Sequence, residues 1–377
     1  MDASTRAVYE TQATRWLVER GASNLDKAQA LAARSAGPTV DLGSGPGFHA
    51  AVLGPPVVAL DGAKAMLDLV PGIAPTALRV QADLTALPFR RGALAAAWAH
   101  HSYVHVRRSD LPLALADLHR SLRLGAPVVL RVFGGDAEGE PLADDDFPGR
   151  FFALWPEERL RTVVERAGFA IEALIAEPGS RGRPALTVTA VRGRALPDYV
   201  RAGLRVLCVG LNPSLHAADA GVAYVSGSNR FWRAAVAAGL VSRPRDPRHA
   251  VAEGVGFTDI ARRPTARADE LAAEEYRTGY AELDALVRWL QPGVVVFVGL
   301  AGWRAAVDRR AGPGPQDRAI GGRPAYVLPS TSGLNARTPL ADLVAHLHAA
   351  LALVAEQPPA PAPARQSSRA PTPGRPH

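Results

Sequence analysis

The sequence predicts an α/β protein of two domains, in which a larger, open seven-stranded sheet precedes a smaller α/β/α sandwich. Three observations predict this fold class. The chain has 377 residues, more than one ordinary domain needs. Apolar runs of strand length alternate with amphipathic segments of helix length. The alternation breaks once, at residues 192–197, and then starts again, which is typical of a domain boundary.

The first domain is expected to span residues 1–195. Helical patterns, such as those at residues 111–122 and 157–167, separate most of its apolar runs, so the sheet should be mainly parallel. A short Pro/Gly-rich turn joins the last two runs, which favours an antiparallel hairpin at one edge. The seven expected strands are residues 39–42, 57–60, 78–82, 94–99, 127–133, 169–175 and 185–191.

The second domain is expected to span residues 196–356. We expect strands at 204–210, 294–299 and 325–328, and helices at 229–238, 268–290 and 340–356. Residues 357–377 form a Pro/Arg-rich tail that cannot build a core, so we expect it to be disordered.

Composition limits the class of protein. Hydrophobic residues make up 47% of the chain, but no run of about 18 apolar residues and no signal-peptide pattern is present. We therefore expect a cytoplasmic, nucleoid-associated protein. The single cysteine, Cys208, excludes an intramolecular disulfide and a thiolate metal cluster, and its apolar neighbours indicate a core position. We expect no metal site.

Charge separates the two halves of the chain. Residues 1–200 are neutral, with 22 basic and 22 acidic side chains, whereas residues 201–377 carry the whole formal excess of +7. A basic half beside a neutral one suggests that the second half meets a polyanion such as nucleic acid. Compositional drift in an arginine-rich protein is the alternative.

A glycine-rich motif follows the first strand. Gly43, Gly45 and Gly47 stand at every second position after Asp41, where they let the backbone turn sharply and approach a ligand closely. A carboxylate, Asp61, ends the next strand about 20 residues on, where it could accept both hydroxyls of a ribose.

This segment resembles the class I S-adenosylmethionine-dependent methyltransferases, which have a Rossmann-like sheet and a first motif of the form D-x-G-x-G-x-G. The resemblance extends to Asp83 and the Leu-Pro-Phe at residues 87–89. It implies S-adenosyl-L-methionine as cofactor. The three glycines would surround its methionine moiety, Asp61 would hold the ribose, Asp83 would contact the adenine amino group, and Asp41 would orient the amino-acid end. A relic fold that no longer binds is the alternative, and the glycine spacing disfavours a nicotinamide cofactor.

The methyl acceptor is not evident from the sequence. The segment after the fourth strand lacks the N/D-P-P-Y/F signature of DNA amino methyltransferases, and no Pro-Cys pair exists for covalent attack on cytosine C5. His100, His101 and His105 lie where a catalytic base could sit, although pocket lining or helix surface is the favoured role. Residues 144–146, three aspartates, are interpreted as a solvated loop.

Four motifs in a fixed order mark the second domain. Asn212 lies in Gly-Leu-Asn-Pro-Ser at 210–214, directly after a strand, where open α/β sheets bind ligands. Ser-Asn-Arg-Phe-Trp occupies 228–232. Gly-Phe-Thr-Asp-Ile at 256–260 is followed by Arg-Pro-Thr at 263–265, and Leu-Pro-Ser-Thr-Ser-Gly-Leu-Asn at 328–335 follows the last strand.

Together these motifs resemble the mismatch-specific uracil/thymine-DNA glycosylase family. The resemblance implies that Asn212 positions the water that attacks C1′ and that Tyr224 stacks on the base. It places Ser330 against the base and backbone, and makes Leu334 the wedge that fills the space of the flipped nucleotide. Asn229 and Arg230 belong to the second motif, on the base-pocket and DNA side. The partner would be double-stranded DNA with a mispaired or damaged pyrimidine.

The residue types agree with that chemistry. An asparagine orients water but is a poor base, which suits hydrolysis of bases already weakened by mispairing. Arg230, Arg263 and Arg337 could hold phosphates or be ordinary solvated arginines. Ser214 departs from the family's glycine, and the serine-rich loop near Ser330 leaves the choice between uracil, thymine and damaged pyrimidines open.

The sequence thus predicts a base excision repair glycosylase, needing no cofactor of its own, fused to a methyltransferase of unknown acceptor, in a chain that we expect to be monomeric. Two alternatives remain. The methyltransferase fold could be an inactive scaffold beside an active glycosylase, or both folds could serve a non-enzymatic DNA-binding protein.

Overall fold

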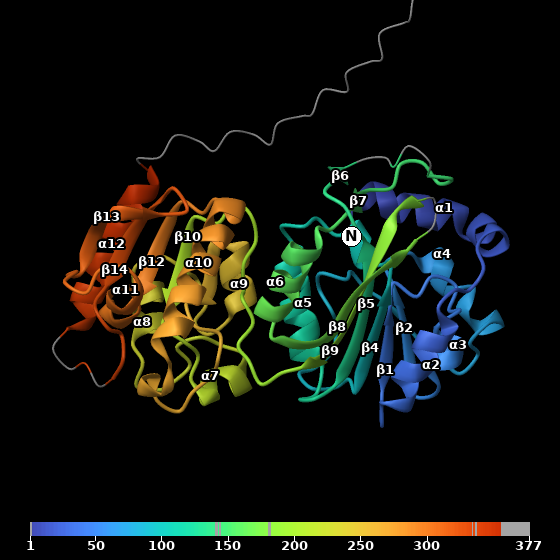
Figure 1. The fold of residues 1–377 in the computed structure, drawn as a ribbon, viewed down its shortest axis with the longest axis horizontal. Helices are drawn as coiled ribbons and strands as arrows, with labels where there is room; N and C mark the ends of the chain where they lie inside the picture. The colour runs from blue at the N-terminus through green and yellow to red at the C-terminus, as the bar shows by residue number, and fades with distance from the viewer. Residues whose placement is uncertain are drawn as a thin grey trace, which may run out of the picture.

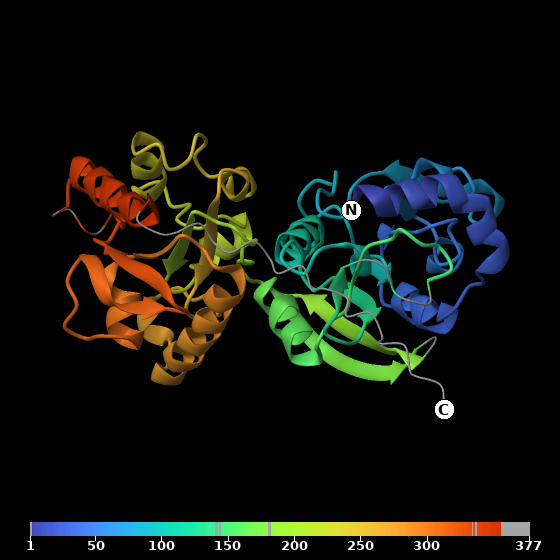
Figure 2. The same cartoon turned by 90° about the horizontal axis from the view of Figure 1, so that it is seen from above.

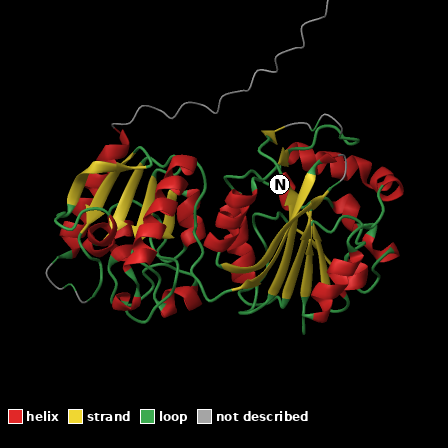
Figure 3. Ribbon diagram, in the orientation of Figure 1, coloured by secondary structure: helices red, strands yellow, loops and turns green. Residues whose placement is uncertain are grey.

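The computed structural model describes residues 2–139, 142, 145–179, 182–333, 335 and 338–355. It contains two large sheets, one in each half of the chain, and each is flanked by helices on both faces (Figures 1 and 3). The end of the second domain at 356 and the tail at 357–377 lie outside the described residues. None of the described helices is long and apolar enough to span a membrane.

The first sheet has seven strands, as the apolar runs predicted. Their order is β3-β2-β1-β4-β5-β9-β8, in which β1 to β5 are parallel and β9 runs antiparallel to both of its neighbours. The expected edge hairpin is therefore present. The strands are β1 (Thr39–Leu42), β2 (Val57–Asp61), β3 (Leu78–Gln81), β4 (Ala96–His100), β5 (Pro127–Phe133), β8 (Phe169–Pro178) and β9 (Pro184–Arg192).

Two apolar clusters hold the helices of this half against the sheet. One packs α2 (Leu25–Ala33) and α3 (Ala50–Leu53) on one face. The other packs α5 (Leu111–Ser121) and α6 (Glu157–Arg166) on the opposite face. Above the sheet lie α1 (Ala3–Glu19) and a short hairpin of β6 (Glu138–Gly139) and β7 (Phe152–Ala153), whereas α4 (Lys64–Leu67) lies beside it, below α1 (Figure 1).

The second sheet has five strands in the order β11-β10-β12-β14-β13. Four are parallel, and the edge strand β13 is antiparallel to β14. The sequence predicted three of these strands and missed β11 and β13. The strands are β10 (Val206–Gly210), β11 (Val255–Asp259), β12 (Val294–Val298), β13 (Gly314–Ile320) and β14 (Arg323–Leu328).

Helices cover both faces of this sheet (Figure 3). Its core includes Cys208, which is fully buried in the middle of β10, as its apolar neighbours predicted. The helices are α7 (Leu215–Ala220), α8 (Phe231–Ala237), α9 (Pro247–Ala252), α10 (Ala273–Leu290), α11 (Leu300–Ala306) and α12 (Leu340–Ala355).

The two halves touch directly. Helices α5 and α6 lie on the side of the first domain that faces the second (Figures 1 and 2). Ala116 of α5 belongs to the apolar core of the second half, and Trp289 of α10 packs against the cores of both.

Candidate functional sites

The glycine loop of the first domain begins directly after β1. Gly43, Gly45 and Gly47 all have positive φ, at 66°, 53° and 95°. The amides of Gly43 and Ser44 both donate to the carbonyl of Leu60 on the neighbouring strand, which folds the loop back over the sheet. A Cβ on Gly43 would lie 2.4 Å from the Cβ of Ser102, so both backbone conformation and space require glycine there.

Asp61, at the carboxyl end of β2, fixes this loop. Its Oδ2 accepts from the amide of Gly45 at 2.9 Å, and its Oδ1 accepts from the amide of Ala63 at 2.8 Å. Burial raises the pKa of Asp61 to about 6, although these amides act in the opposite direction. The carboxylate that the sequence assigned to a ribose therefore also pins the glycine loop.

The other predicted cofactor residues lie beneath the glycine loop or beside it. Asp41 is 1% exposed beneath the loop, and burial raises its pKa to about 8. Gly47 faces Val70, whose Cγ1 would be 3.3 Å from a Cβ at that position. Asp83 accepts from both the amide and the hydroxyl of Thr85, at 2.8 Å each, and so closes the turn after β3.

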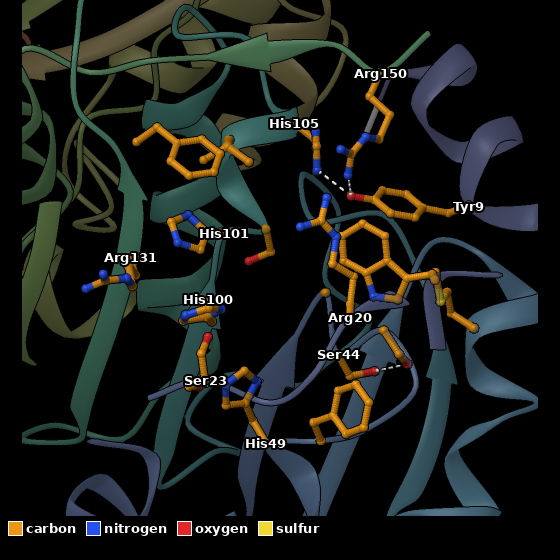
Figure 4. Close-up of a pocket in the computed structure, with 18 of the residues that line it drawn as sticks. Tyr9, Arg20, Ser23, Ser44, His49, His100, His101, His105, Arg131 and Arg150 are labelled. Carbon is orange, nitrogen blue, oxygen red and sulfur yellow. Dashed lines mark hydrogen bonds between the residues drawn. The ribbon is translucent and has the colours of Figure 1, made fainter. Parts of the chain in front are cut away.

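A cavity of about 550 Å³ opens in front of the loop. Gly43, Gly45 and Asp61 line one part of it. The opposite part is lined by side chains from the ends of β4 and β5 and from α1 (Figure 4). A Cβ on Gly45 would have Trp16 Nε1 as its nearest neighbour, at 4.0 Å, so the backbone of the loop faces open space there.

Histidines line the far side of the cavity. His49, His100, His101 and His105 are all in its wall, so the three histidines noted in the sequence line the pocket. Burial lowers the pKa of His101 to about 3 and that of His105 to about 4, and it also lowers the pKa values of His100 and His49. The cavity therefore presents neutral imidazoles. His101 stands directly after β4 with φ of 53°, and its ring stacks on Phe133 at 4.3 Å between centroids.

Tyr9 closes the cavity through a hydrogen-bonded network (Figure 4). The Nδ1–H of His105 donates to the carbonyl of Phe151 at 2.7 Å, so its Nε2 accepts from the hydroxyl of Tyr9 at 2.8 Å. Arg150 donates to the same hydroxyl at 2.8 Å and pairs with Asp145. The interpretation of residues 144–146 as a solvated loop is wrong for Asp145, whose side chain is 3% exposed because it neutralises the buried Arg150. Asp144 lies outside the described residues.

The second site lies at the carboxyl edge of the five-stranded sheet. Gly210, two residues before Asn212, pairs with Asp259, the last residue of β11. Ser330 follows β14, and its Cα would be 3.7 Å from a Cβ on Gly299, which follows β12. The ends of four parallel strands thus bring the Asn212 and Ser330 segments to one edge.

Asn212 is held in a single orientation by its amide nitrogen. Its Nδ2 donates to the hydroxyl of Thr265 at 2.8 Å and to the carbonyl of Arg263 at 3.1 Å, with a further contact to Pro213 O at 3.2 Å. Within the described part of the chain no donor meets its Oδ1. The side chain therefore presents an oxygen that can accept a hydrogen bond from a ligand.

Tyr224 and Asp259 converge over Gly210. A Cβ there would lie 2.0 Å from Asp259 Oδ1 and 3.2 Å from the Tyr224 hydroxyl, so glycine is required by the close approach. Tyr224, with φ of 55°, packs its ring on Phe231 at 4.4 Å. Burial and, to a smaller extent, the charge of Asp198 raise the pKa of Asp259 to about 7. The sequence reasoning missed Asp259, although a carboxylate ending a strand inside a motif was the available signal.

Arg230 holds the loop that follows β14. Its backbone amide donates to Thr331 O at 2.9 Å, and its guanidinium donates to the carbonyls of Ser332, Asn335 and Thr338. The guanidinium is therefore committed to holding this loop. Asn229 accepts from the amide of Phe231 at 2.9 Å at the start of α8. Leu334 and Arg337 lie outside the described residues.

Ser214 and Arg263 also have local partners. The Ser214 hydroxyl accepts from the amide of Ala217 at 3.1 Å and caps α7, which accounts for a serine where the resembling family has glycine. Arg263 pairs with Glu275 at 2.8 Å and donates to the carbonyl of Glu270. These contacts hold both side chains on local partners and do not direct either of them to the amide oxygen of Asn212.

Comparison with known families finds one match in each half of the chain. Residues 197–352 match the uracil DNA glycosylase superfamily, and residues 40–130 match a methyltransferase domain family. The chain therefore carries a domain of each kind.

Solved structures similar to this chain include three methyltransferases. An S-adenosylmethionine-dependent methyltransferase from Methanosarcina mazei is 17% identical, with 41% of this chain and 92% of that chain covered and a TM-score of 0.37. A 1,6-didemethyltoxoflavin N1-methyltransferase from Burkholderia thailandensis is 20% identical over 51% and 88%, with a TM-score of 0.42. One from Mesorhizobium loti is 20% identical over 46% and 99%, with a TM-score of 0.39.

Proposed function

We propose that the second domain is a DNA glycosylase that hydrolyses the N-glycosidic bond of mispaired uracil- or thymine-type bases in double-stranded DNA. In this reaction the oxygen of a bound water forms a bond to C1′ of the flipped nucleotide. The bond from C1′ to the base nitrogen breaks, and its electron pair leaves with the base. Asn212 holds the water, and the proton that the water loses passes to solvent.

The orientation of Asn212 is the observation that carries this proposal. Thr265 and the carbonyl of Arg263 occupy the amide nitrogen, so the oxygen is the atom available to the water. A preoriented acceptor lowers the barrier because the water need not be ordered during the reaction. The amide is neutral, which avoids placing a full negative charge beside the departing anionic base and the DNA phosphates.

We infer that the first domain binds S-adenosyl-L-methionine in the 550 Å³ cavity. The fit rests on the loop that faces open space at Gly45 and on the buried carboxylate of Asp61 at the end of the next strand. Gly43, Gly45 and Asp61 would hold the cofactor, with Asp41 and Gly47 supporting the loop from below and Asp83 beside it. When bound, the cofactor supplies an electrophilic methyl group. The neutral histidines and Arg131 would orient an acceptor at the opposite wall.

The domain limits form part of the proposal. The methyltransferase-like domain would be residues 1–195, the glycosylase domain residues 196–356 and the tail residues 357–377. We propose that the protein acts as a monomer on the nucleoid in the cytoplasm. Size-exclusion chromatography with light scattering should then give a single species of about the chain mass, 39.7 kDa, and a dimer mass would contradict it.

The decisive experiment replaces Asn212. Asn212→Ala should leave folding and DNA binding nearly intact and lower single-turnover release of uracil and thymine from G·U and G·T duplexes by about 10²-fold, or roughly 2.7 kcal/mol. Asn212→Asp supplies a true base but adds a negative charge. Gln316→Ala, which removes an amide side chain on the outer strand β13, is the matched control and should keep wild-type activity. Wild-type excision by Asn212→Ala would make this residue a turn residue only.

DNA as partner is tested by salt. If about four phosphates are neutralised, the logarithm of the association constant for duplex DNA should fall with the logarithm of salt concentration at a slope near −3 to −4. The charge excess of +7 in residues 201–377 motivates this expectation. Salt-independent binding would contradict it.

A further inference from the structure

The last residue of α6 reaches out of the first domain. Arg166 Nη1 donates to Asp198 Oδ2 at 3.0 Å and to the Thr258 hydroxyl at 3.1 Å. That hydroxyl in turn donates to Asp198 Oδ1 at 2.7 Å. All three residues are buried, at 4–5% exposure. Thr258 lies in β11, one residue before Asp259, so a guanidinium of the first domain is fixed against a strand of the second.

A second contact runs from the neighbouring residue of α6. Glu165 pairs with Arg262 at 3.2 Å, and Arg262 also pairs with Glu282 of α10 at 3.1 Å. Glu282 lies 3.3 Å from Arg166 Nη2, which joins the two contacts into one network. We call the six residues of this network the interdomain clamp: Glu165, Arg166, Asp198, Thr258, Arg262 and Glu282.

The interdomain clamp contacts the same segment of the chain that orients Asn212. Residues 260–265 run beside residues 210–215 and continue the pairing of β11 with β10. The amide of Ile260 donates to Gly210 O at 3.0 Å, that of Ala261 to Leu211 O at 2.9 Å and that of Thr265 to Pro213 O at 3.2 Å. Arg262 is thus one residue from the Arg263 carbonyl and three from the Thr265 hydroxyl that hold the Asn212 amide.

We propose that α6 of the methyltransferase domain contributes to the glycosylase site. Glu165 and Arg166 are positioning residues that hold residues 258–265 in place. That segment in turn keeps Asn212 in the reactive geometry. This inference rests on the proposed function. It assigns the first domain a role in base excision that is separate from methyl transfer. In this role neither residue contacts the flipped base or the attacking water, because both act through residues 258–265.

The clamp acts by stiffening residues 258–265. A surface loop orders its residues at an entropic cost, and a water-holding amide loses rate when its support moves by a fraction of an ångström. Releasing the segment would remove the buried Thr258 acceptor from Arg166. It would also separate Arg262 from its partners Glu165 and Glu282. The clamp therefore favours one position of the segment over all others.

The experiment compares clamp variants in the full chain. Glu165→Gln should lower the single-turnover rate of uracil release from a G·U duplex about threefold, and Arg166→Lys about tenfold, with the dissociation constant for DNA unchanged within twofold. Glu165→Gln combined with Arg262→Gln should cost no more than Arg262→Gln alone, because that change already removes the contact between Glu165 and Arg262. Arg248→Gln is the matched control. It breaks another interdomain ion pair, to Asp117 at 2.5 Å, that leaves residues 258–265 untouched, and it should keep the wild-type rate.

A second measurement does not depend on catalysis. Hydrogen exchange should quicken at the amides of Ile260, Ala261 and Thr265 in Glu165→Gln and Arg166→Lys, and not in Arg248→Gln. If the wild-type protein released no base, the proposed glycosylase function would be wrong. Hydrogen exchange would still show whether Glu165 and Arg166 hold residues 258–265 in place. The inference is overturned if the clamp variants show wild-type exchange in this segment, or wild-type rates despite faster exchange. Equal losses in Arg248→Gln would also overturn it, since docking alone would then matter.

Discussion

In both domains the candidate site lies at the carboxyl edge of a mainly parallel sheet, but the two edges are built differently. In the first domain the edge opens into a cavity of about 550 Å³, and its loop is held by a buried carboxylate, Asp61. In the second domain the edge presents a neutral amide, Asn212, fixed by the 260–265 segment. One edge therefore encloses a cavity, whereas the other exposes a single oriented acceptor atom.

The difference follows from what stands above each sheet. Helix α1 and the β6–β7 hairpin lie over the first edge, and Tyr9, Arg150 and His105 close it by hydrogen bonds (Figure 4). At the second edge the corresponding polar groups, including those of Arg230, bind the surrounding loops to one another. The proposed duplex substrate would need an accessible edge, whereas the proposed cofactor would need an enclosed one.

The largest expected effect is a loss of cofactor affinity when Asp61, at the carboxyl edge of the first sheet, is replaced. Asp61→Ala removes the acceptor for the Gly45 amide and for a ribose, each a charge-assisted hydrogen bond of about 1.5–3 kcal/mol. We expect the affinity for S-adenosylhomocysteine, measured by titration calorimetry on the full chain, to fall at least about 100-fold. Asp68→Ala, an equal charge change at an exposed position, should bind normally. Undiminished binding by Asp61→Ala would remove the cofactor assignment.

The next largest effect is a slower excision rate when Thr265, at the carboxyl edge of the second sheet, is replaced. Thr265→Val removes the 2.8 Å acceptor of Asn212 Nδ2 with little change in side-chain volume. The amide can then rotate, and we expect single-turnover excision to fall about tenfold, or roughly 1.4 kcal/mol, with unchanged DNA affinity. Thr278→Val, on the exposed face of α10, is the control. If both variants excise alike, the Arg263 carbonyl is enough to orient Asn212.

The smallest effect concerns stability. Burial raises the folded-state pKa of Asp41 to about 8, above the unfolded value near 3.9. Its contribution to folding is therefore complete below pH 4 and is lost as pH rises toward 8. Between pH 7 and 8 the wild type without ligand should lose about 1 kcal/mol from this group. Asp41→Asn cannot ionise, so its urea unfolding free energy should change less over this interval. Parallel pH profiles would show that Asp41 is not protonated in the fold.

Much of this arrangement could be predicted from the sequence because it depends on local signals. Apolar runs with helical spacers gave the seven strands, and the glycine spacing located the loop whose φ values only glycine adopts readily. The strand before Asn212 put that residue at a carboxyl edge. Each of these signals lies within a few residues of the feature that it predicts.

The rest depends on contacts between distant segments. Strand β13 escaped prediction because its Pro315–Ala319 stretch is polar and mostly exposed at an edge, so it lacks a strand's apolar alternation. Nothing near Arg230 in the sequence shows that its guanidinium binds carbonyls 102 to 108 residues away. Asp259 gains its raised pKa only when the fold buries its carboxyl group and brings Asp198 near it.

Trp289 has a consequence for how the chain unfolds. Its ring packs against the apolar cores of both domains, and the guanidinium of Arg159 on α6 lies 5.6 Å from the ring centroid. Separating the halves would expose this indole and Ala116 to water at the same moment. Melting of either half thus removes part of the other's apolar contacts, so heat should be absorbed in one cooperative transition. We therefore expect the methyltransferase and uracil DNA glycosylase superfamily domains to unfold together, although each has its own sheet.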